Sequence, residues 1–289
     1  MKQQIDVNST QISIPGSSVE YKAIYFKALQ MMKNYRNTEQ IDQNSAVVTI
    51  PDQVLKQALL HLQRLISIGV KFTYPGDFNY PQVFNQMIER PLFLEYIGSA
   101  CWNDLKMISV VGSRDCHDLT DQWINSELLL FLKNQPVGLV SGGARGVDFK
   151  SHLVSLKAGR PTIVVLPSGL GWIYPKELYY IQKQVIEAGG AFISEFDYDS
   201  QIRKSYFYHR NRLIAALGQV CLVAQASTRS GTMLTVHHSL QNGRPVITIP
   251  AHPGLVQFSG NIKLMSEGAP FIVDATDLNN FWTSEAWSS

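Results

Sequence analysis

The sequence predicts an α/β protein in which a doubly wound, mainly parallel sheet follows a small, mainly helical N-terminal unit. Two observations predict the sheet. Six short apolar runs, rich in β-branched residues, lie between residues 106 and 251, and segments with helical periodicity separate them. Because each run is apolar throughout, each strand is expected to be buried on both faces, which is typical of a parallel sheet covered by helices.

The strands and helices of this sheet follow one another in regular alternation. The six predicted strands lie at 107–113, 137–143, 162–169, 190–196, 219–225 and 245–251. The helices predicted between them lie at about 121–132, 147–156, 176–188, 210–217 and 232–241. Parallel strands are joined by right-handed crossovers, so a ligand is expected beyond the carboxyl ends of the strands.

A helical unit is expected before the sheet. Residues 21–35 and 52–68 are apolar at helical spacing, and Pro51 precedes the second segment, where its missing N–H does no harm. Residues 72–98 are expected to be connecting structure. We place the helical unit at 1–70 with its first ~20 residues loose, the α/β domain at 71–275 and a C-terminal tail at 276–289.

Composition and motifs exclude several classes of protein. The chain has 289 residues, 45% of them hydrophobic, and a formal charge of +2, so bulk charge does not indicate a nucleic-acid partner. The three cysteines have no metal-binding spacing. Neither an 18-residue apolar run nor a secretory signal is present, which favours a cytoplasmic protein without a membrane partner. The patterns GxGxxG, GxxxxGK[ST] and GxSxG are absent.

Glycines and cations follow the first two predicted strands. Ser113 and Arg114 come after the first strand, and Gly142, Gly143 and Arg145 come after the second. Glycine lets the backbone come close to a ligand, and the free N–H groups of a helix start bind anions. These loops meet at one edge of the predicted sheet, so together they indicate a phosphate-binding pocket. A single loop of this kind is equally compatible with a simple turn.

The strongest local signal is the segment 203–212, RKSYFYHRNR. It holds four lysines or arginines, no acid and three consecutive aromatic residues. Cations follow a phosphate backbone, and aromatic rings stack on unpaired bases, so the segment favours a single strand over a duplex. The alternative is a solvated helix start with some of its rings packed in the core.

Several motifs together resemble one family, DprA/Smf, the DNA-processing protein A of bacterial natural transformation. The resemblance covers about residues 70–275. The matching segments are VVGSR at 110–114, SGGARGVD at 141–148 with His152, LPSGL at 166–170 with Tyr174-Pro175, SEF at 194–196, FYHRNRLIA at 207–215, SGTMLT at 230–235, GRP at 243–245, and Gly260-Asn261 with Gly268-Ala269.

The resemblance implies a Rossmann-like domain that binds single-stranded DNA without strong sequence preference and is not an enzyme. It also implies a homodimer that loads the RecA recombinase on the strand during DNA uptake, with no cofactor and no metal. By position, Arg114 and Lys204 match the family's cationic DNA contacts and Phe207 its stacking aromatic. Further candidates for the pocket are Ser113, Gly142, Gly143, Arg145, Arg210, Asn211 and Arg212.

The chain departs from the family pattern at three places. We expect no winged helix after the sheet domain, where many members carry one, and residues 1–60 lack the family's glycine-rich helical hairpin. Gln225 stands where an acid is usual, so a salt bridge that depends on this acid would be lost.

Two other functions remain open from the sequence. One is a Rossmann-like nucleotide sensor or a phosphoribohydrolase, although segment 229–233 lacks the glutamate of the PGGxGTxxE loop that such hydrolases use. The other is an adaptor whose loops bind no ligand.

Overall fold

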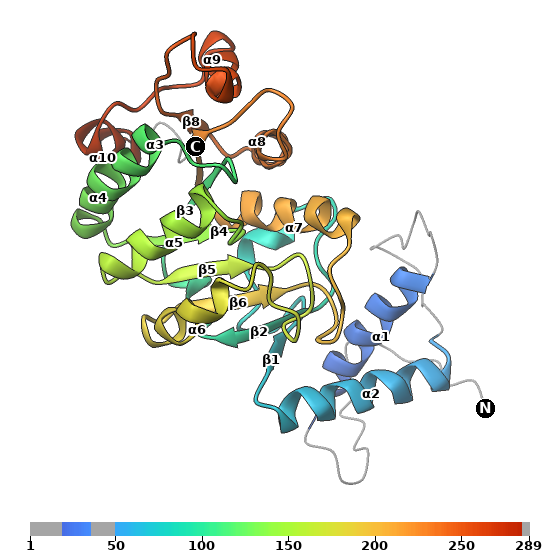
Figure 1. The fold of residues 1–289 in the computed structure, drawn as a ribbon. Helices are drawn as coiled ribbons and strands as arrows, with labels where there is room; N and C mark the ends of the chain where they lie inside the picture. The colour runs from blue at the N-terminus through green and yellow to red at the C-terminus, as the bar shows by residue number, and fades with distance from the viewer. Residues whose placement is uncertain (1–18, 36–49, 285–289) are drawn as a thin grey trace. The chain divides into compact units, whose positions relative to one another are not determined.

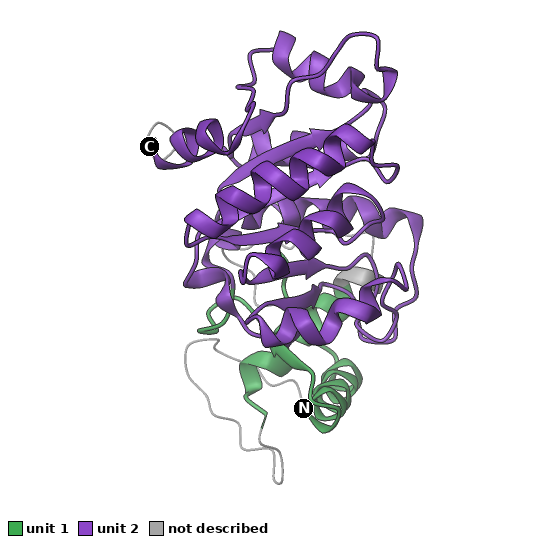
Figure 2. Ribbon diagram, turned by 60° about the vertical axis from the view of Figure 1, so that its left-hand side comes forward, with its two compact units in different colours: residues 1–80, 91–95 green, residues 81–90, 96–289 purple. Residues whose placement is uncertain are grey.

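A computed structural model describes residues 19–35 and 50–284 of the chain. The chain divides into two compact units, which Figure 2 shows in different colours. The first unit comprises residues 1–80 and 91–95, and the second comprises residues 81–90 and 96–289. Most of the predicted loose N-terminal segment lies outside the described residues.

The first unit is built on two helices, α1 (Tyr21–Tyr35) and α2 (Asp52–Ser67), followed by the short strand β1 (Lys71–Thr73). Both helices were predicted from their apolar spacing. Leu62 and Leu65 of α2 are fully buried, as the predicted stripe requires. None of the helices in the described ranges has both the length and the apolar character that crossing a membrane requires.

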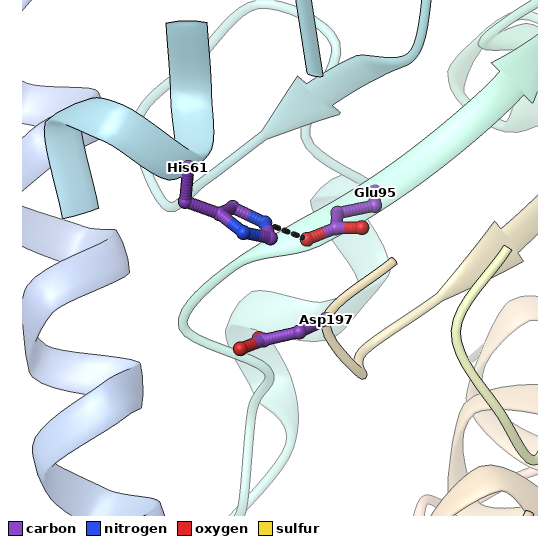
Figure 3. Close-up of side chains that lie close together, drawn as sticks. All are labelled: His61, Glu95 and Asp197. Carbon is purple, nitrogen blue, oxygen red and sulfur yellow. Dashed lines mark hydrogen bonds and ion pairs between the residues drawn. The ribbon is translucent and has the colours of Figure 1, made fainter. Parts of the chain in front are cut away.

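A buried ion pair lies inside the first unit. The Nζ atom of Lys27 is 3.0 Å from Oε1 of Glu95, and both side chains are 1% exposed or less. The Nε2 atom of His61 lies 2.6 Å from the same carboxylate oxygen (Figure 3). The lysine also lies 4.8 Å from the centre of the Phe93 ring. Burying both charges is tolerated because each has a partner of opposite charge and hydrogen bonds.

The second unit contains the predicted parallel sheet. Its strands are β3 (Met107–Gly112), β4 (Gly138–Ser141), β5 (Thr162–Val165), β6 (Ala191–Ser194), β7 (Val220–Gln225) and β8 (Val246–Thr248). They pair in parallel in the order β6-β5-β4-β3-β7-β8. All six predicted strands are confirmed, each within the predicted range.

Residues 72–98 are not only connecting structure, as the sequence analysis expected. They contain a 3₁₀ helix, η1 (Gln82–Gln86), and a strand, β2 (Leu94–Gly98). The part of β2 from Tyr96 onward belongs to the second unit, where β2 is next to β6 in the strand order. The prediction was wrong because the prolines and glycines of this stretch concealed a short strand.

Helices cover both faces of the sheet (Figure 1). On β3, Ile108 and Val110 belong to the core cluster that also contains Val147 of helix α5 (Val147–Lys157). Ser109, between them, donates a 2.6 Å hydrogen bond to the carbonyl of Ile214 in helix α7 (Lys204–Leu217). Successive strand residues point to opposite faces, so α5 and α7 lie on opposite sides. This arrangement confirms the doubly wound α/β fold.

The remaining helices agree with the prediction in part. The segment predicted as one helix at 121–132 consists of α3 (Asp118–Trp123), a π-helical stretch η3 (Ile124–Leu128) and α4 (Leu129–Asn134). Helices α6 (Leu178–Glu187) and α8 (Thr232–Gln241) lie where they were predicted. Beyond β8 are η4 (Val256–Phe258) and α9 (Ser259–Ser266). The C-terminal tail contains α10 (Ala275–Thr283), which buries Leu278 and Trp282 in the core.

The order of the strands determines where a ligand can bind. The chain passes from β3 outward to β6 on one side, then returns to β7, on the other side of β3, and continues to β8. The connections after β3 and β7 therefore leave the sheet in opposite directions. A crevice is expected between the carboxyl ends of these two strands, at Gly112 and Gln225.

Candidate nucleic-acid interface

A cleft of about 440 Å³ lies at the carboxyl ends of β3 and β7. The residues that line it come from the end of β3 and the loop after it, from the start of α5 and the loop before it, from the first turns of α7, and from the start of α8 and the loop before it. They are Val111, Gly112, Ser113, Arg114, Ala144, Asp148, Phe207, Arg210, Asn211, Ser230, Gly231, Thr232, Leu234 and Thr235. The cleft therefore occupies the crevice that the strand order predicts.

Two guanidinium groups lie near the ring of Phe207 in this cleft. The guanidinium carbon of Arg114 is 5.2 Å from the centre of the phenyl ring, and that of Arg210 is 5.9 Å away. Helix α7 begins at Lys204, six residues before the predicted start at 210, so Phe207 is in its first turn. Lys204 itself is exposed, three positions before Phe207. The cleft thus holds an aromatic ring beside the exposed cation Arg114, whereas Lys204 is not among the lining residues and starts the helix that carries the ring.

Arg210 is a buried cation that supports this arrangement. Its side chain is 5% exposed and its Nη1 atom is 3.9 Å from the carboxylate of Asp148. Burial lowers the pKa of Arg210, Asp148 opposes this shift and the nearby Arg114 adds to it, with a net value of about 10. A Cβ atom built on Gly142 would collide with the guanidinium group. The structure thus indicates that Gly142 leaves room for Arg210.

Asp148 is held as a structural partner of Arg210. Burial raises the pKa of its carboxyl group, while Arg210 and backbone hydrogen bonds from Ala144, Gly112 and Gly142 act in the opposite direction. A carboxylate engaged by these groups is poorly placed to move a proton for a substrate.

His152 lies close to the same ion pair. Its Nδ1 is 2.7 Å from the hydroxyl oxygen of Thr162. Burial and the nearby Arg210 lower the pKa of His152 to about 3, so the imidazole stays neutral near pH 7. His152 is therefore a buried, hydrogen-bonding residue that supports the structure.

The loop that carries Arg114 is fixed by Gln225. The Gln225 carbonyl accepts a 2.8 Å hydrogen bond from the amide of Ser113. Its side chain donates from Nε2 to the carbonyl of Asp115 at 2.9 Å and accepts at Oε1 from the amide of His117 at 2.8 Å. A carboxylate could accept but not donate here. The amide that replaces the usual acid therefore provides hydrogen bonds in place of the salt bridge whose loss the sequence analysis expected.

The structure brings together half of the candidate residues. Ser113, Arg114, Phe207, Arg210 and Asn211 line the cleft, and the amide of Asn211 donates to the carbonyl of Gly231 at 3.4 Å. Both residues of the helix-start sequence Ser230-Gly231 face the cleft as well. The sequence analysis did not count them as binding residues, although glycine before a helix was a usable signal.

Three other candidates have different environments. Arg145 is exposed but pairs with Glu177 at 2.8 Å. Arg212 is buried and pairs with Glu195 at 2.5 Å, away from the cleft residues. Gly143 has a positive φ of 67° and packs against Leu178 of α6, so its backbone turn explains the glycine.

The three consecutive aromatics point to different places. Phe207 faces the cleft, whereas Tyr206 stacks on Phe196 with ring centres 3.8 Å apart and an interplanar angle of 11°. Tyr208 makes an edge contact with His238, with ring centres 5.1 Å apart. Tyr206 thus packs against its own protein, but both rings of this stacked pair are only partly buried and neither belongs to the core.

The sequence of this chain is similar to known proteins of one family. The family model described as DNA recombination-mediator protein A matches residues 71–283. The DNA processing protein DprA of Streptococcus pneumoniae is 32% identical over 202 residues, which are 70% of this chain and 71% of that protein. The protein Smf of Synechocystis is 29% identical over 212 residues, 72% of this chain and 53% of that protein. The chain thus spans about half the length of the second relative.

Solved structures resemble the fold. The X-ray structure of DNA processing protein A from Streptococcus pneumoniae has a TM-score of 0.70 and 26% sequence identity, covering 89% of this chain and 92% of that one. A structure from Helicobacter pylori has a TM-score of 0.65 and 25% identity, covering 74% of this chain and 97% of that one. The Helicobacter pylori structure describes a single-stranded DNA binding mode of DNA processing protein A.

Proposed function

The chain belongs to the DNA recombination-mediator protein A family, and from that premise we propose that its cleft binds single-stranded DNA without strong sequence preference. The observation that carries the proposal is the position of Phe207, a partly exposed ring in the cleft with Arg114 beside it. A duplex keeps its bases stacked on each other, whereas a single strand offers an unpaired base to such a ring.

Three residues of the cleft, and Lys204 at the start of α7, have roles in this proposal. The Phe207 ring stacks on a base, and Arg114 and Lys204 contact phosphates on either side of it. Arg210 is buried against Asp148 and positions the ring. Stacking and phosphate contacts do not read base edges, which is the physical reason to expect little sequence preference.

The comparisons support the same ligand. The Helicobacter pylori relative is described by its single-stranded DNA binding mode, and the family is described by recombination mediation. We extend to this chain the homodimer, the loading of RecA and the cytoplasmic role in DNA uptake that the family resemblance implies.

The proposed function is binding without catalysis. The carboxylate that lines the cleft, Asp148, is engaged by Arg210 and by backbone amides. We therefore assign it a structural role, and we assign the cleft no metal or cofactor.

The test is fluorescence anisotropy with labelled DNA of about 30 nucleotides, single-stranded or duplex, at several salt concentrations. We expect tight single-strand binding that weakens with salt, together with weaker duplex binding. Binding to free nucleotides with no affinity for single strands would overturn the proposal and favour a nucleotide sensor instead.

A further inference from the structure

A second pocket lies beside α7, on another side of the helix from the DNA cleft. Its volume is about 210 Å³. The residues that line it come from the end of η1 and the segment after it, from α7, and from the end of α8. They are Gln86, Met87, Ile88, Glu89, Tyr208, Arg212, His238, Gln241 and Asn242, all in the second unit.

The helical repeat of α7 relates the two pockets. Phe207 and Asn211 line the cleft, and Tyr208 and Arg212, each one position later, line the second pocket. Residues four apart share one side of a helix, so α7 presents two adjacent rows to two adjacent pockets.

Helix α8 contributes lining residues to both pockets. Thr232 lines the cleft and His238 lines the second pocket, six positions further along the helix. This separation corresponds to about 9 Å along the helix axis. Thr235, which also lines the cleft, precedes His238 by three positions on the same side of α8, so the two pockets are neighbours along this helix.

The second pocket contains buried donors that lack a partner among the described residues. Arg212 is 5% exposed, and its Nη2 atom binds the Glu195 carboxylate, but its Nε and Nη1 atoms make no hydrogen bond. The Nε2 atom of His238, 7% exposed, also has none. Buried polar atoms are rarely left unsatisfied, so these atoms indicate a ligand with acceptor or donor groups.

Charge and size restrict what that ligand can be. Glu195 neutralises Arg212, and Glu89 lines the pocket, so a phosphate would meet two acidic groups. Ligand pockets for drug-sized molecules start at roughly 300 Å³, so about 210 Å³ suits a smaller group than a whole nucleotide. The Tyr208 ring, 47% exposed, offers a face for a flat group. A neutral, planar, hydrogen-bonding group fits these conditions.

We propose that this pocket takes a second base of the same DNA strand, stacked on Tyr208 and hydrogen bonded by Arg212 and His238. The inference rests on the proposed function, because the strand reaches the pocket from the cleft. It gives the protein two stacking positions along α7 and α8, one at Phe207 and one at Tyr208.

The binding test compares wild type with Tyr208→Ala and Tyr208→Phe, using labelled single strands of about 30 thymidines. Tyr208→Ala is expected to weaken binding about 5-fold or more with an unchanged salt dependence, since a stacked base contributes 1–3 kcal/mol. Tyr208→Phe keeps the ring and is expected to bind like wild type. Tyr180→Ala, which removes an exposed tyrosine from α6, is the matched control and is expected to have no effect.

Photo-crosslinking with 5-iododeoxyuridine in the strand provides a readout that does not depend on the stability of a variant. A crosslink at Tyr208 in the wild-type protein supports the second base position. Absence of that crosslink, with Tyr208→Ala binding like wild type, overturns the inference while the proposed function stands. A shallower salt dependence in Tyr208→Ala also overturns it, because it would indicate a phosphate contact. If the wild type fails to bind single strands at all, the proposed function fails first.

Discussion

The guanidinium group of Arg114 lies over the ring of Phe207, with 5.2 Å between the guanidinium carbon and the ring centre. The arginine follows β3 and the phenylalanine is in the first turn of α7, so the two meet only when the sheet is formed. A cation held near an aromatic face can contact a phosphate while the free part of the ring stacks on a base. This pair is the basis of the first two predictions.

Removing the ring should weaken DNA binding without changing its electrostatics. Phe207→Ala is expected to lower the affinity for single strands by about 5- to 160-fold, which corresponds to one lost stacking contact of about 1–3 kcal/mol. The slope of log affinity against log salt should stay unchanged. Phe207→Trp keeps a stacking surface and serves as the control in an anisotropy titration. Equal affinity of the alanine variant and wild type would contradict the stacking role.

Removing an exposed cation should change the salt dependence of DNA binding, which removal of the ring leaves unchanged. Lys204→Ala is expected to reduce the salt slope by about 0.7, the value for one phosphate contact on a single strand. It should weaken binding to all sequences alike, and the loss should shrink as salt rises. Lys183→Ala, an exposed lysine paired with Glu187 on α6, is the matched control. A loss that depends on base sequence would count against a phosphate contact.

Arg145 should contribute little to DNA binding, although the sequence pattern selected it. Its guanidinium group pairs with Glu177 at 2.8 Å on the surface, so its charge is already compensated. Arg145→Ala is expected to change single-strand affinity by less than about twofold, and an exposed ion pair of this kind adds about 0–1 kcal/mol to stability. An affinity loss as large as that of Lys204→Ala would contradict this prediction and show that Arg145 contacts the DNA.

The sheet could be predicted from the sequence because each buried strand is a continuous apolar run. The partners of the ion pairs could not be predicted from the sequence. Arg145 pairs with a glutamate 32 residues away and Arg212 with one 17 residues away, and these residues meet only in the folded chain. The start of α7 was placed too late because its first turn joins two exposed polar residues to two partly buried rings and has no apolar periodicity. In the sequence, Tyr208 was distinguished only as one of three consecutive aromatic residues. It lines a different pocket from Phe207 because both residues belong to the helix that begins at Lys204.

Gln225 should be sensitive to a single-atom change. Gln225→Glu replaces the Nε2 donor to the carbonyl of Asp115 with an acceptor, at a side chain that is 1% exposed. The expected cost is about 1–3 kcal/mol of unfolding free energy, because the Asp115 carbonyl loses its donor and faces a carboxylate. Single-strand affinity should also fall, since the same loop carries Arg114.

Denaturant unfolding and anisotropy together test this prediction. Gln122→Glu, an exposed position on α3, makes the same chemical change at the surface and should leave both quantities unaltered. If Gln225→Glu kept the wild-type stability and affinity, the amide would not be what fixes the Arg114 loop.

His152 should make the stability of the protein depend on pH. Its pKa is about 3 in the folded protein, where burial and Arg210 disfavour the imidazolium, against an ordinary value of 6.5 in the unfolded chain. Between these values the unfolded chain binds the extra proton, so stability falls as pH decreases, by at most about 1.4 kcal/mol per pH unit from this residue.

His152→Gln removes the titrating group and keeps a side chain that can hydrogen bond to Thr162. Urea unfolding of both proteins, from above the ordinary histidine pKa down to about pH 5, is expected to show a shallower loss for the variant. Asp148 titrates in both proteins, so the difference between the two curves isolates His152. Parallel curves would mean that the imidazole gains its proton in the folded protein as readily as in the unfolded chain. That result would contradict the burial of His152 beside Arg210.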